Sequence, residues 1–487
     1  MEIALCASPL NAYPAAFMAA ASPAPHPEVA PAALRSPLAA EIAATLRLSL
    51  PLAAANVLQM LVYAIDVVFV ARLGQEALAA SSLSVALFGL IAWCLSGLTG
   101  AVAPLIAAEL GQRRHAVRQI RRSVRMALWL ALASSVFGMA VCLMGEPLML
   151  LTGQDPHVAA RAGGFLGVLM LALPPMICSN VLRTFVSAMG RPIFATMITA
   201  VAIFVNAFGN WIFVFGHLGA PALGLEGSAL ASCATGVVTL LAYVLAIRGD
   251  RRLRRYRLLG RFWRPEWRRL GEILRIGLPI AATILAEAGL FSGAAFLMGR
   301  IGEAQLAGHT VALQVAAFAF QVPFGIGQAA TIRVGYHFGA GDRAGITRAG
   351  WAAIAAGVGF MALSAGTMLV AARPIIALYI DLADPANAAM AGYAAQFMLV
   401  AAAFQLFDGM QAVAAGALRG LQDARVPMLI AIFAYWVPGA AVSVGLGLWT
   451  PLAGLGVWLG LLVALVIVAA MLLWRWHRRE GYGLVPA

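Results

Sequence analysis

The chain has 487 residues, of which 62% are hydrophobic and only 11% are charged, and its mean hydropathy is +0.89. Soluble globular proteins carry about 25% charged residues. No soluble core could bury this much apolar surface, so the composition excludes a water-soluble fold and indicates a membrane protein. The net charge is +13, and all 33 basic residues are arginines.

The first 45 residues are rich in alanine and proline, as in AASPAPHPEVAPAAL. They do not combine a basic segment with a following apolar core, so they are not typical of a signal peptide. We predict that residues 1–45 form a disordered cytoplasmic tail.

Twelve hydrophobic segments follow, each of about 20–28 residues, a length that suits α-helices crossing a bilayer core of about 30 Å. They are too long and too continuous for the strands of a membrane β-barrel, which alternate over about ten residues. The sequence therefore predicts an all-α polytopic membrane protein with twelve transmembrane helices. The predicted spans cover residues 47–71, 82–108, 126–146, 162–186, 192–215, 224–247, 274–298, 305–332, 350–372, 392–418, 426–448 and 450–474.

One arginine-rich stretch, RGDRRLRRYRLLGRFWRPEWRRLGEILR, separates the sixth span from the seventh. Its arginines and the aromatic residues Phe262, Trp263 and Trp267 predict an amphipathic segment at the membrane interface, with nucleic-acid binding as a remote alternative. The predicted organisation is an N-lobe, an interlobe loop, a C-lobe and a cytoplasmic C-terminal tail. Their ranges are 46–247, 248–273, 274–475 and 476–487.

The arginines are distributed unequally between the two sides of the predicted bilayer. With an even number of spans both termini share one side, and 29 of the 33 arginines fall there. The loops of the other side hold four, Arg72, Arg161, Arg300 and Arg373. Because positive residues accumulate on the cytoplasmic side, we expect both termini and the interlobe loop to be cytoplasmic. The predicted location of the protein is the inner membrane of the cell.

The two halves repeat each other at a constant offset of 228 residues. Pro51 falls on Pro279, and Arg72, Gly97 and Gly111 fall on the equivalent residues Arg300, Gly325 and Gly339. Six spans repeated from the same side of the membrane predict two pseudo-symmetric six-helix lobes related by an axis along the membrane normal. Transporters of this architecture bind substrate between the lobes and rock them to alternate access.

Three acidic residues lie well inside the predicted spans, Asp66, Glu287 and Asp408. A charge at mid-bilayer costs about 2.5–3.5 kcal/mol on insertion scales, so each is a candidate functional residue. The structural alternative is a carboxylate that hydrogen-bonds to a neighbouring helix.

Asn206 and Asn210 share one face of the fifth span because they are four residues apart. Asn210 lies at a depth similar to that of Asp66. A carboxylate with two carboxamides can bind a hard cation or share a proton. The alternative for Asn210, which precedes Trp211, is a packing role.

Several segments resemble the multidrug and toxic compound extrusion (MATE) family, and specifically its NorM-like branch. IDVVFVARLGQEALAASSL and GAVAPLIAAELGQRR are similar to its first two helices, and VNAFGNWIFVFG to its fifth. FQVPFGIGQAATIRVGYHFGAGD and FQLFDGMQAVAAGALRGLQDARVP are similar to the eighth and tenth. The likeness runs from about residue 45 to residue 475.

The resemblance implies a V-shaped pair of six-helix lobes and an antiporter that expels organic cations and drugs as Na⁺ or H⁺ enters. It assigns the cation-coupling role to Glu287 and Asp408, a pair that could hold Na⁺, and it favours Na⁺ over H⁺. We extend the candidate coupling set to Asp66, Asn206 and Asn210. In one departure from some NorM-like members, Asp381 and Asp384 lie outside the tenth span.

Aromatic side chains of the second half could line a cleft for flat cationic drugs, although packing is the default role of aromatic residues in membrane helices. These residues are Phe291, Phe404, Phe407, Tyr435 and Trp436. Arg333 and Arg419 lie at predicted helix ends, and we interpret them as lipid or helix-end anchors.

We expect no enzyme activity, no cofactor other than the coupling ion, no nucleic-acid partner and a monomer in the lipid bilayer. A P-loop is excluded because the chain contains no lysine, and no HExxH or GxSxG motif occurs. Two alternatives stay open. The first is a lipid-linked oligosaccharide flippase of the same wider superfamily, which would carry cationic residues in its central cavity. The second is a channel or a receptor-like membrane protein.

Overall fold

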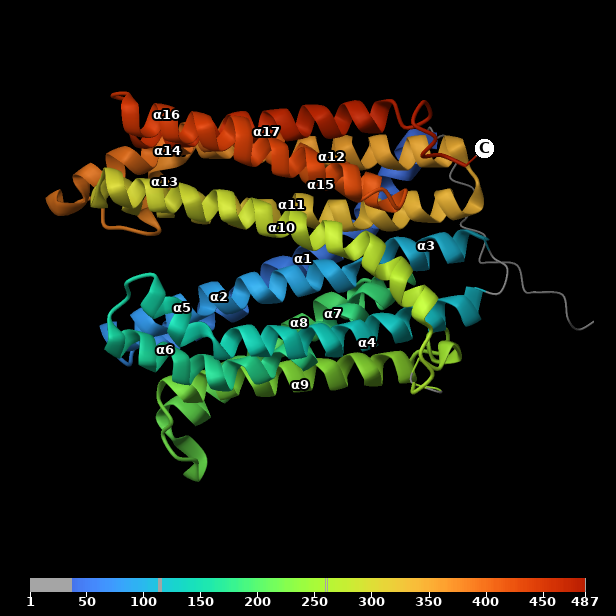
Figure 1. Cartoon of the computed structure of the whole chain (residues 1–487), viewed down its shortest axis with the longest axis horizontal. Coiled ribbons are helices and arrows are strands. Elements are labelled where there is room, and N and C mark those ends of the chain that lie inside the picture. The colour runs from blue at the N-terminus through green and yellow to red at the C-terminus, as the bar shows by residue number, and fades with distance from the viewer. Residues whose placement is uncertain (1–36, 113–115, 259, 261, 487) are drawn as a thin grey trace, which may run out of the picture.

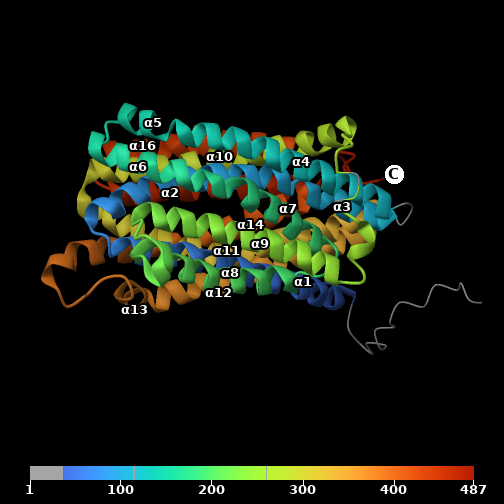
Figure 2. The ribbon, with the colours of Figure 1, turned by 90° about the horizontal axis from the view of Figure 1, so that it is seen from below.

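The computed structural model describes residues 37–112, 116–258, 260 and 262–486, and the regular elements in these ranges are all helical. Twelve spans in this part of the chain are long and apolar enough to cross a membrane. This finding confirms the predicted all-α architecture, and each of the twelve predicted segments lies on one of these spans, with the last helix starting at Gly454. The helices run along the long axis of the molecule (Figures 1 and 2).

The first six spans form the N-lobe, whose core combines the buried apolar residues of these helices with residues of the connector and of the seventh span, such as Ile273, Ile276 and Ile280. Two of the spans are each built from two consecutive helices, and a short helix lies beside the start of the fourth span. The elements are α1 (Pro37–Ala71), α2 (Gln75–Gly100), α3 (Val102–Gln112), α4 (Ala116–Leu143), α5 (Gly145–Leu151), α6 (Pro156–Leu169), α7 (Leu173–Ala188), α8 (Ile193–Phe215) and α9 (Leu225–Gly249).

The remaining spans form the C-lobe, with its own core. Its eleventh span is interrupted by a π-helical turn at Tyr435–Gly439. The elements are α10 (Trp267–Ile301), α11 (Glu303–Ala340), α12 (Arg343–Val370), α13 (Ala372–Ala377), α14 (Ala388–Gly420), α15 (Arg425–Ala434), α16 (Ala440–Trp449) and α17 (Gly454–His477).

The two lobes diverge toward the end that carries α5 and α13 and converge toward the end that carries α3 and the C-terminus (Figure 1). The second end also carries the segment that joins the lobes and the turns after α11 and α14. Most of the described arginines, among them Arg118, Arg275 and Arg425, belong to the loops and helix ends of this side, and it is called the arginine-rich end.

Glycines related by the internal repeat bring the lobes together at the arginine-rich end. Gly111 of α3 lies against the backbone of Tyr336 and Ala340 on α11, and Gly339 of α11 lies against the backbone of Ala108 on α3. A Cβ atom at either glycine would overlap main-chain atoms, so only glycine permits this approach. Such a reciprocal contact between equivalent residues is what a two-fold pseudosymmetry axis between the lobes requires.

Helix α1 starts at Pro37, so the predicted disordered tail does not extend over residues 37–45. Residues 1–36 lie outside the described part of the chain. Proline fits the first helical turn because the amide groups there have no intrahelical partner. The added turns contact the other lobe, where Arg333 of α11 donates from Nη2 to Glu41 Oε1 at 2.6 Å. Arg333 is therefore an interlobe ion-pair partner, which differs from the anchor role that we predicted.

Helix α10 starts at Trp267, before the predicted seventh span, and its first turns are attached to the N-lobe. Glu266 accepts a hydrogen bond from Arg125 of α4. Arg269 Nη1 lies 3.1 Å from Glu109 Oε1 on α3. Because the later turns of α10 pack in the C-lobe core, this helix joins both lobes.

The connector, residues 250–266, is packed against the N-lobe. Tyr256 is buried and meets Phe185 of α7 edge to face, with ring centroids 5.5 Å apart. Trp129 of α4 stacks on Phe262 and donates from Nε1 to its carbonyl at 2.9 Å. Two aromatic side chains at the end of this segment are exposed, as expected for an interfacial position, Trp263 and Trp267. The connector is thus docked on the N-lobe, and its position at the membrane interface stays a prediction.

Candidate functional site

The N-lobe polar cluster is centred on Asp66 of α1. Asn206 and Asn210 of α8 donate from Nδ2 to Asp66 Oδ1 at 3.0 and 2.8 Å. Ser232 of α9 donates from its hydroxyl to Asp66 Oδ2 at 3.1 Å. The structure therefore brings together the three residues that were predicted for this lobe and adds Ser232, which sequence reasoning missed.

The geometry of this cluster follows from helix periodicity. Asn206 and Asn210 are four residues apart, so both amides face α1, and both are fully buried. Three donors on one carboxylate stabilise its charged form in an apolar surrounding. Asn210 Oδ1 is buried and has no hydrogen-bond partner among the described residues. This oxygen and the carboxylate are the acceptors that a proton or a small cation would use.

The C-lobe polar cluster joins α10, α14 and the π-helical turn. Gln411 donates from Nε2 to Glu287 Oε1 at 3.3 Å and to Asp408 Oδ1 at 3.2 Å. The Tyr435 hydroxyl donates to Gln411 Oε1 at 2.7 Å. Glu287 and Asp408 therefore contact the same amide, and Gln411 is the residue that links them.

Local sequence explains how these side chains meet. Asp408 and Gln411 are three residues apart on α14 and so share one face. Pro438 lies within the π-helical turn and has no N–H for the carbonyl four residues earlier, which favours an irregular turn over a continuous α-helix. Tyr435, the first residue of this turn, is buried with its hydroxyl on Gln411.

Two carboxyl groups that share one amide donor repel each other when both are ionised. A proton or a cation placed between them relieves this repulsion. Among the residues that the structure describes, no three or more His, Cys, Asp and Glu side chains form a metal-binding group. A cation held by Glu287 and Asp408 would therefore need further ligands from neutral oxygens, and the Gln411 amide, which presents Nε2 to both carboxyl groups, would have to turn to supply one.

The aromatic residues predicted to line a cleft occupy different environments. Phe404 and Tyr435 are buried in the C-lobe core, where Phe404 packs edge to face on Phe291 at 6.1 Å. These two side chains are therefore not exposed to a cleft in this conformation, because ring packing and the hydroxyl bond to Gln411 hold them inside. Phe407 is partly buried, and Trp436 is 51% exposed and packs on Gly289 of α10.

The basic residues near the seam between the lobes also have defined contacts. Arg183 of α7 donates to Asn56 Oδ1 on α1, and Asn56 Nδ2 lies 3.5 Å from the Gln321 carbonyl of α11. Sequence reasoning counted Arg183 only as a charge of the arginine-rich side. Arg419 donates from Nε to the carbonyl of Ala415 at 3.2 Å within its own helix, as a helix-end residue does.

The chain is similar to known proteins over most of its length. The MatE family model matches residues 51–212 and 279–444, and the two matches start 228 residues apart, in agreement with the internal repeat. The chain is 44% identical over 440 residues to the probable multidrug resistance protein NorM of Mesorhizobium japonicum, covering 90% of this chain and 94% of the relative. It is 37% identical over 443 residues to the multidrug resistance protein NorM of Burkholderia vietnamiensis, with coverage of 90% and 94%.

A similar fold occurs in the crystal structure of the Vibrio cholerae MATE transporter VcmN. The similarity covers 91% of this chain and 98% of that chain, with a TM-score of 0.82 and 16% sequence identity. A eukaryotic MATE transporter gives a TM-score of 0.81 with 19% identity, covering 89% of this chain and 95% of that chain. At these identities the comparison shows a common arrangement of helices.

Proposed function

Because this chain belongs to the MatE family of membrane transporters, we propose that it is a secondary antiporter that exports organic cations and drugs across the inner membrane as Na⁺ or H⁺ enters. The family consists of transporters and not of enzymes. The names of the two NorM relatives support multidrug export as the activity. The observation that carries the proposal is the pairing of Glu287 and Asp408 through Gln411 inside the membrane-spanning helices.

The lobe arrangement supports alternating access. The reciprocal contacts of Gly111 and Gly339 and the Arg333–Glu41 ion pair close the arginine-rich end, while the lobes diverge toward the other end. With the arginine-rich end in the cytoplasm, this conformation is open to the outside. Ion binding promotes transport only if its free energy differs between the two lobe arrangements. The proposed ion site between α10 and α14 supports such a difference in binding free energy, because α10 is attached to both lobes and moves when they rearrange.

The driving force is sufficient for drug export. One charge that moves inward through 100 mV supplies about 2.3 kcal/mol. With tight coupling, this free energy supports roughly a 50-fold outward accumulation of an uncharged drug, whereas one-for-one exchange with a monovalent cationic drug moves no net charge and is driven by the concentration gradient of the ion. Partly exposed aromatic side chains of the C-lobe, Phe407 and Trp436, are the proposed contacts for flat cationic substrates.

We propose Na⁺ as the coupling ion, with H⁺ as the alternative. The Asp66 cluster offers a hydrogen-bonded carboxylate with one unpartnered amide oxygen, and the Glu287–Asp408 pair offers two carboxyl groups that contact the same Gln411 amide. Oxygen ligands of this type suit a hard cation. The test is drug efflux from proteoliposomes with Na⁺ and pH gradients imposed separately. Efflux that follows the proton gradient and ignores Na⁺ would assign H⁺, and efflux that follows neither gradient would contradict antiport.

A lipid-linked oligosaccharide flippase is the second candidate, and Arg183 at the seam between the lobes favours it, because a flippase needs cationic residues for its phosphate groups. The carboxylates of the two polar clusters favour cationic ligands and hence the antiporter. Drug accumulation in cells, measured beside the turnover of lipid-linked intermediates, separates the two. An effect of deletion on lipid intermediates alone would favour the flippase.

A further inference from the structure

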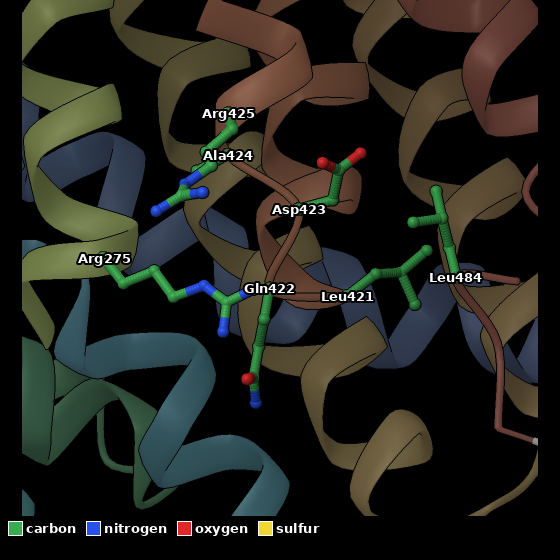
Figure 3. A pocket seen from close by; sticks show the side chains of 7 residues that line it. All are labelled: Arg275, Leu421, Gln422, Asp423, Ala424, Arg425 and Leu484. Atoms are coloured by element: carbon green, nitrogen blue, oxygen red, sulfur yellow. The ribbon is translucent and has the colours of Figure 1, made fainter. Parts of the chain in front are cut away.

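A pocket of about 210 Å³ lies at the arginine-rich end, where the turn between α14 and α15 meets α10. Its polar lining consists of Arg275, Gln422, Asp423 and Arg425 (Figure 3). Gln422 adopts a φ of 61°, the left-handed conformation that ends helix α14, with the Asp423 N–H bonded to the Leu418 carbonyl.

Two guanidinium groups face this pocket without a carboxylate partner. Within the described ranges no ion pair or hydrogen bond connects Arg275 or Arg425 to an acidic side chain. The nearest acidic residues in the chain are Glu272 and Asp423. Glu272 pairs with Arg268 and Arg269, and the Asp423 carboxylate accepts from Arg475 Nε at 2.6 Å. In Figure 3 it points away from the two guanidinium groups, which lie on the other side of the turn. Two like charges held near each other favour an anion between them.

The corresponding place in the N-lobe is neutralised by the protein itself. Arg191 precedes α8, the fifth span, as Arg425 begins α15, the eleventh. Arg191 Nη2 lies 3.5 Å from Asp250 Oδ2. Among the described residues Arg425 has no comparable ion pair, so the basic pair of this pocket is available to an external anion.

The pocket has walls from both lobes. Arg275 lies between Ile273 and Ile276 of α10, and both isoleucines are buried in the N-lobe core. Gln422 and Arg425 flank the end of α14 and the start of α15 in the C-lobe. An anion that contacts both arginines would therefore connect the lobes at the end where they already meet.

The position suits the headgroup of a membrane lipid. Arg425 is the first residue of a membrane span, so its side chain lies at a level where lipid phosphates are found. An apolar groove of about 460 Å³ lies between α15 and α17, lined by Val426, Ile430 and Trp474 among others. Lipid chains therefore have apolar surface beside the basic pocket.

We propose that Arg275, Gln422 and Arg425 bind a phosphate group and thereby stabilise the conformation that is closed at the arginine-rich end. Guanidinium groups recognise phosphate oxygens in pairs, and the Gln422 amide supplies a further donor. The phosphate is carried by an anionic phospholipid of the adjoining leaflet or is free inorganic phosphate, and both sources have the same chemistry. This site is independent of the two carboxylate clusters, so it can be tested apart from transport.

The test is the thermal unfolding of the full-length protein, purified in detergent and stripped of lipid. Phosphatidylglycerol, phosphatidylcholine and inorganic phosphate are added in separate titrations at constant ionic strength. We expect phosphatidylglycerol to raise Tm by about 3 °C or more, with little change from phosphatidylcholine. An equal rise with inorganic phosphate would identify free phosphate as the source and still support the pocket.

Variants localise the effect. Arg275→Gln and Arg425→Gln should each abolish the rise, and the double variant should lose no more, because one anion contacts both side chains. The matched control is Arg118→Gln, which removes an exposed arginine of α4 from the same end. Arg275→Lys and Arg425→Lys serve if the glutamine variants fold poorly, and they should retain part of the rise. Equal responses in the pocket variants and in Arg118→Gln, or no response to either phosphate source, would overturn the proposal.

Discussion

The hydroxyl of Tyr435 donates to Oε1 of Gln411 at 2.7 Å, and this contact fixes which way the amide points. Because the hydroxyl takes the amide oxygen, the Nε2 group must face Glu287 and Asp408. A tyrosine in the π-helical turn thus orients the donor that the two carboxyl groups share. We expect this orientation to affect ion coupling.

The substitution Tyr435→Phe removes this hydroxyl without removing the ring. The buried Gln411 oxygen is then left without its donor, which costs about 1–3 kcal/mol. We expect ion-coupled efflux to fall by roughly a factor of ten, the effect of about 1.4 kcal/mol, while drug binding changes less. The control is Tyr393→Phe, since the Tyr393 ring stacks on Phe397 in the same lobe, 6.2 Å away. Equal losses in both variants would indicate a general packing defect.

Glu287→Gln and Asp408→Asn should each abolish coupled export in a protein that still folds. An amide keeps the shape of the carboxyl group and part of its hydrogen bonding, so a structural role predicts that transport survives. Drug resistance of cells is measured at matched expression, and folding is checked by size-exclusion chromatography. Near-normal resistance from both variants would contradict the coupling role.

Asp66→Asn should impair export separately from the Glu287 variant, because the two clusters lie in different lobes and share no residue. Ser232→Ala removes a single donor from the same carboxylate. We expect it to change the free energy of ion or proton binding at Asp66 by about 1 kcal/mol or less, which shifts the ion or pH dependence of efflux. The measurement is efflux rate against Na⁺ concentration and pH in proteoliposomes. Unchanged ion and pH dependence in both variants would assign this cluster to packing.

Breaking the Glu41–Arg333 ion pair should favour opening at the arginine-rich end. The pair is partly exposed and joins the two lobes, so its loss is expected to shift the lobe equilibrium by ~1 kcal/mol. Cys94 is a natural reporter because its Sγ lies 3.9 Å from the Ala281 carbonyl across the seam. In a background without the other cysteines, Glu41→Gln should increase Cys94 labelling about fivefold.

The reversed pair, Glu41→Arg with Arg333→Glu, should return labelling toward the native rate. Glu480→Gln is the control, since Glu480 is exposed and only loosely paired with Arg479 at 3.9 Å. If Glu480→Gln increases Cys94 labelling as strongly as Glu41→Gln does, the Glu41–Arg333 ion pair does not control opening at the arginine-rich end.

The proposed orientation can be tested with single cysteines introduced at Arg251 and Glu480 in a cysteine-free protein. Both positions are exposed at the arginine-rich end. A membrane-impermeant maleimide added to intact cells should not label them, whereas Gln154→Cys, in the turn before α6, should react quickly. Rapid labelling of Arg251→Cys and Glu480→Cys would contradict the proposed orientation and place both termini outside the cell.

The spans and much of the two clusters were predictable because they depend on local sequence. Hydrophobic length defines a membrane helix, and the spacing of Asn206 and Asn210 places both on one face. Gln411 was also within reach, since it lies three residues after Asp408. Its importance was hidden because its orienting partner, Tyr435, is positioned by the π-helical turn, and such turns are not apparent in hydropathy.

Long-range contacts could not be predicted in the same way. Glu41 lies in a segment of tail-like composition, and its helical structure accompanies a contact with Arg333, 292 residues later. The burial of Tyr256 in the connector depends likewise on Phe185 of an earlier span. The composition of the sequence around Glu41 or Tyr256 gives no information about either distant partner.

The attachment of the connector to the N-lobe has a consequence for biosynthesis. A polypeptide emerges from the ribosome N-terminus first, and early segments fold before late ones. Glu109 pairs with Arg269, and Arg125 pairs with Glu266. Glu109 and Arg125 therefore lack these partners in the nascent chain until the start of α10 has been synthesised. The first lobe therefore completes its arginine-rich end only when synthesis of the second has begun. Substitutions at Glu266 or Arg269 should then appear first as slow membrane assembly and early degradation, before any defect in the mature transporter.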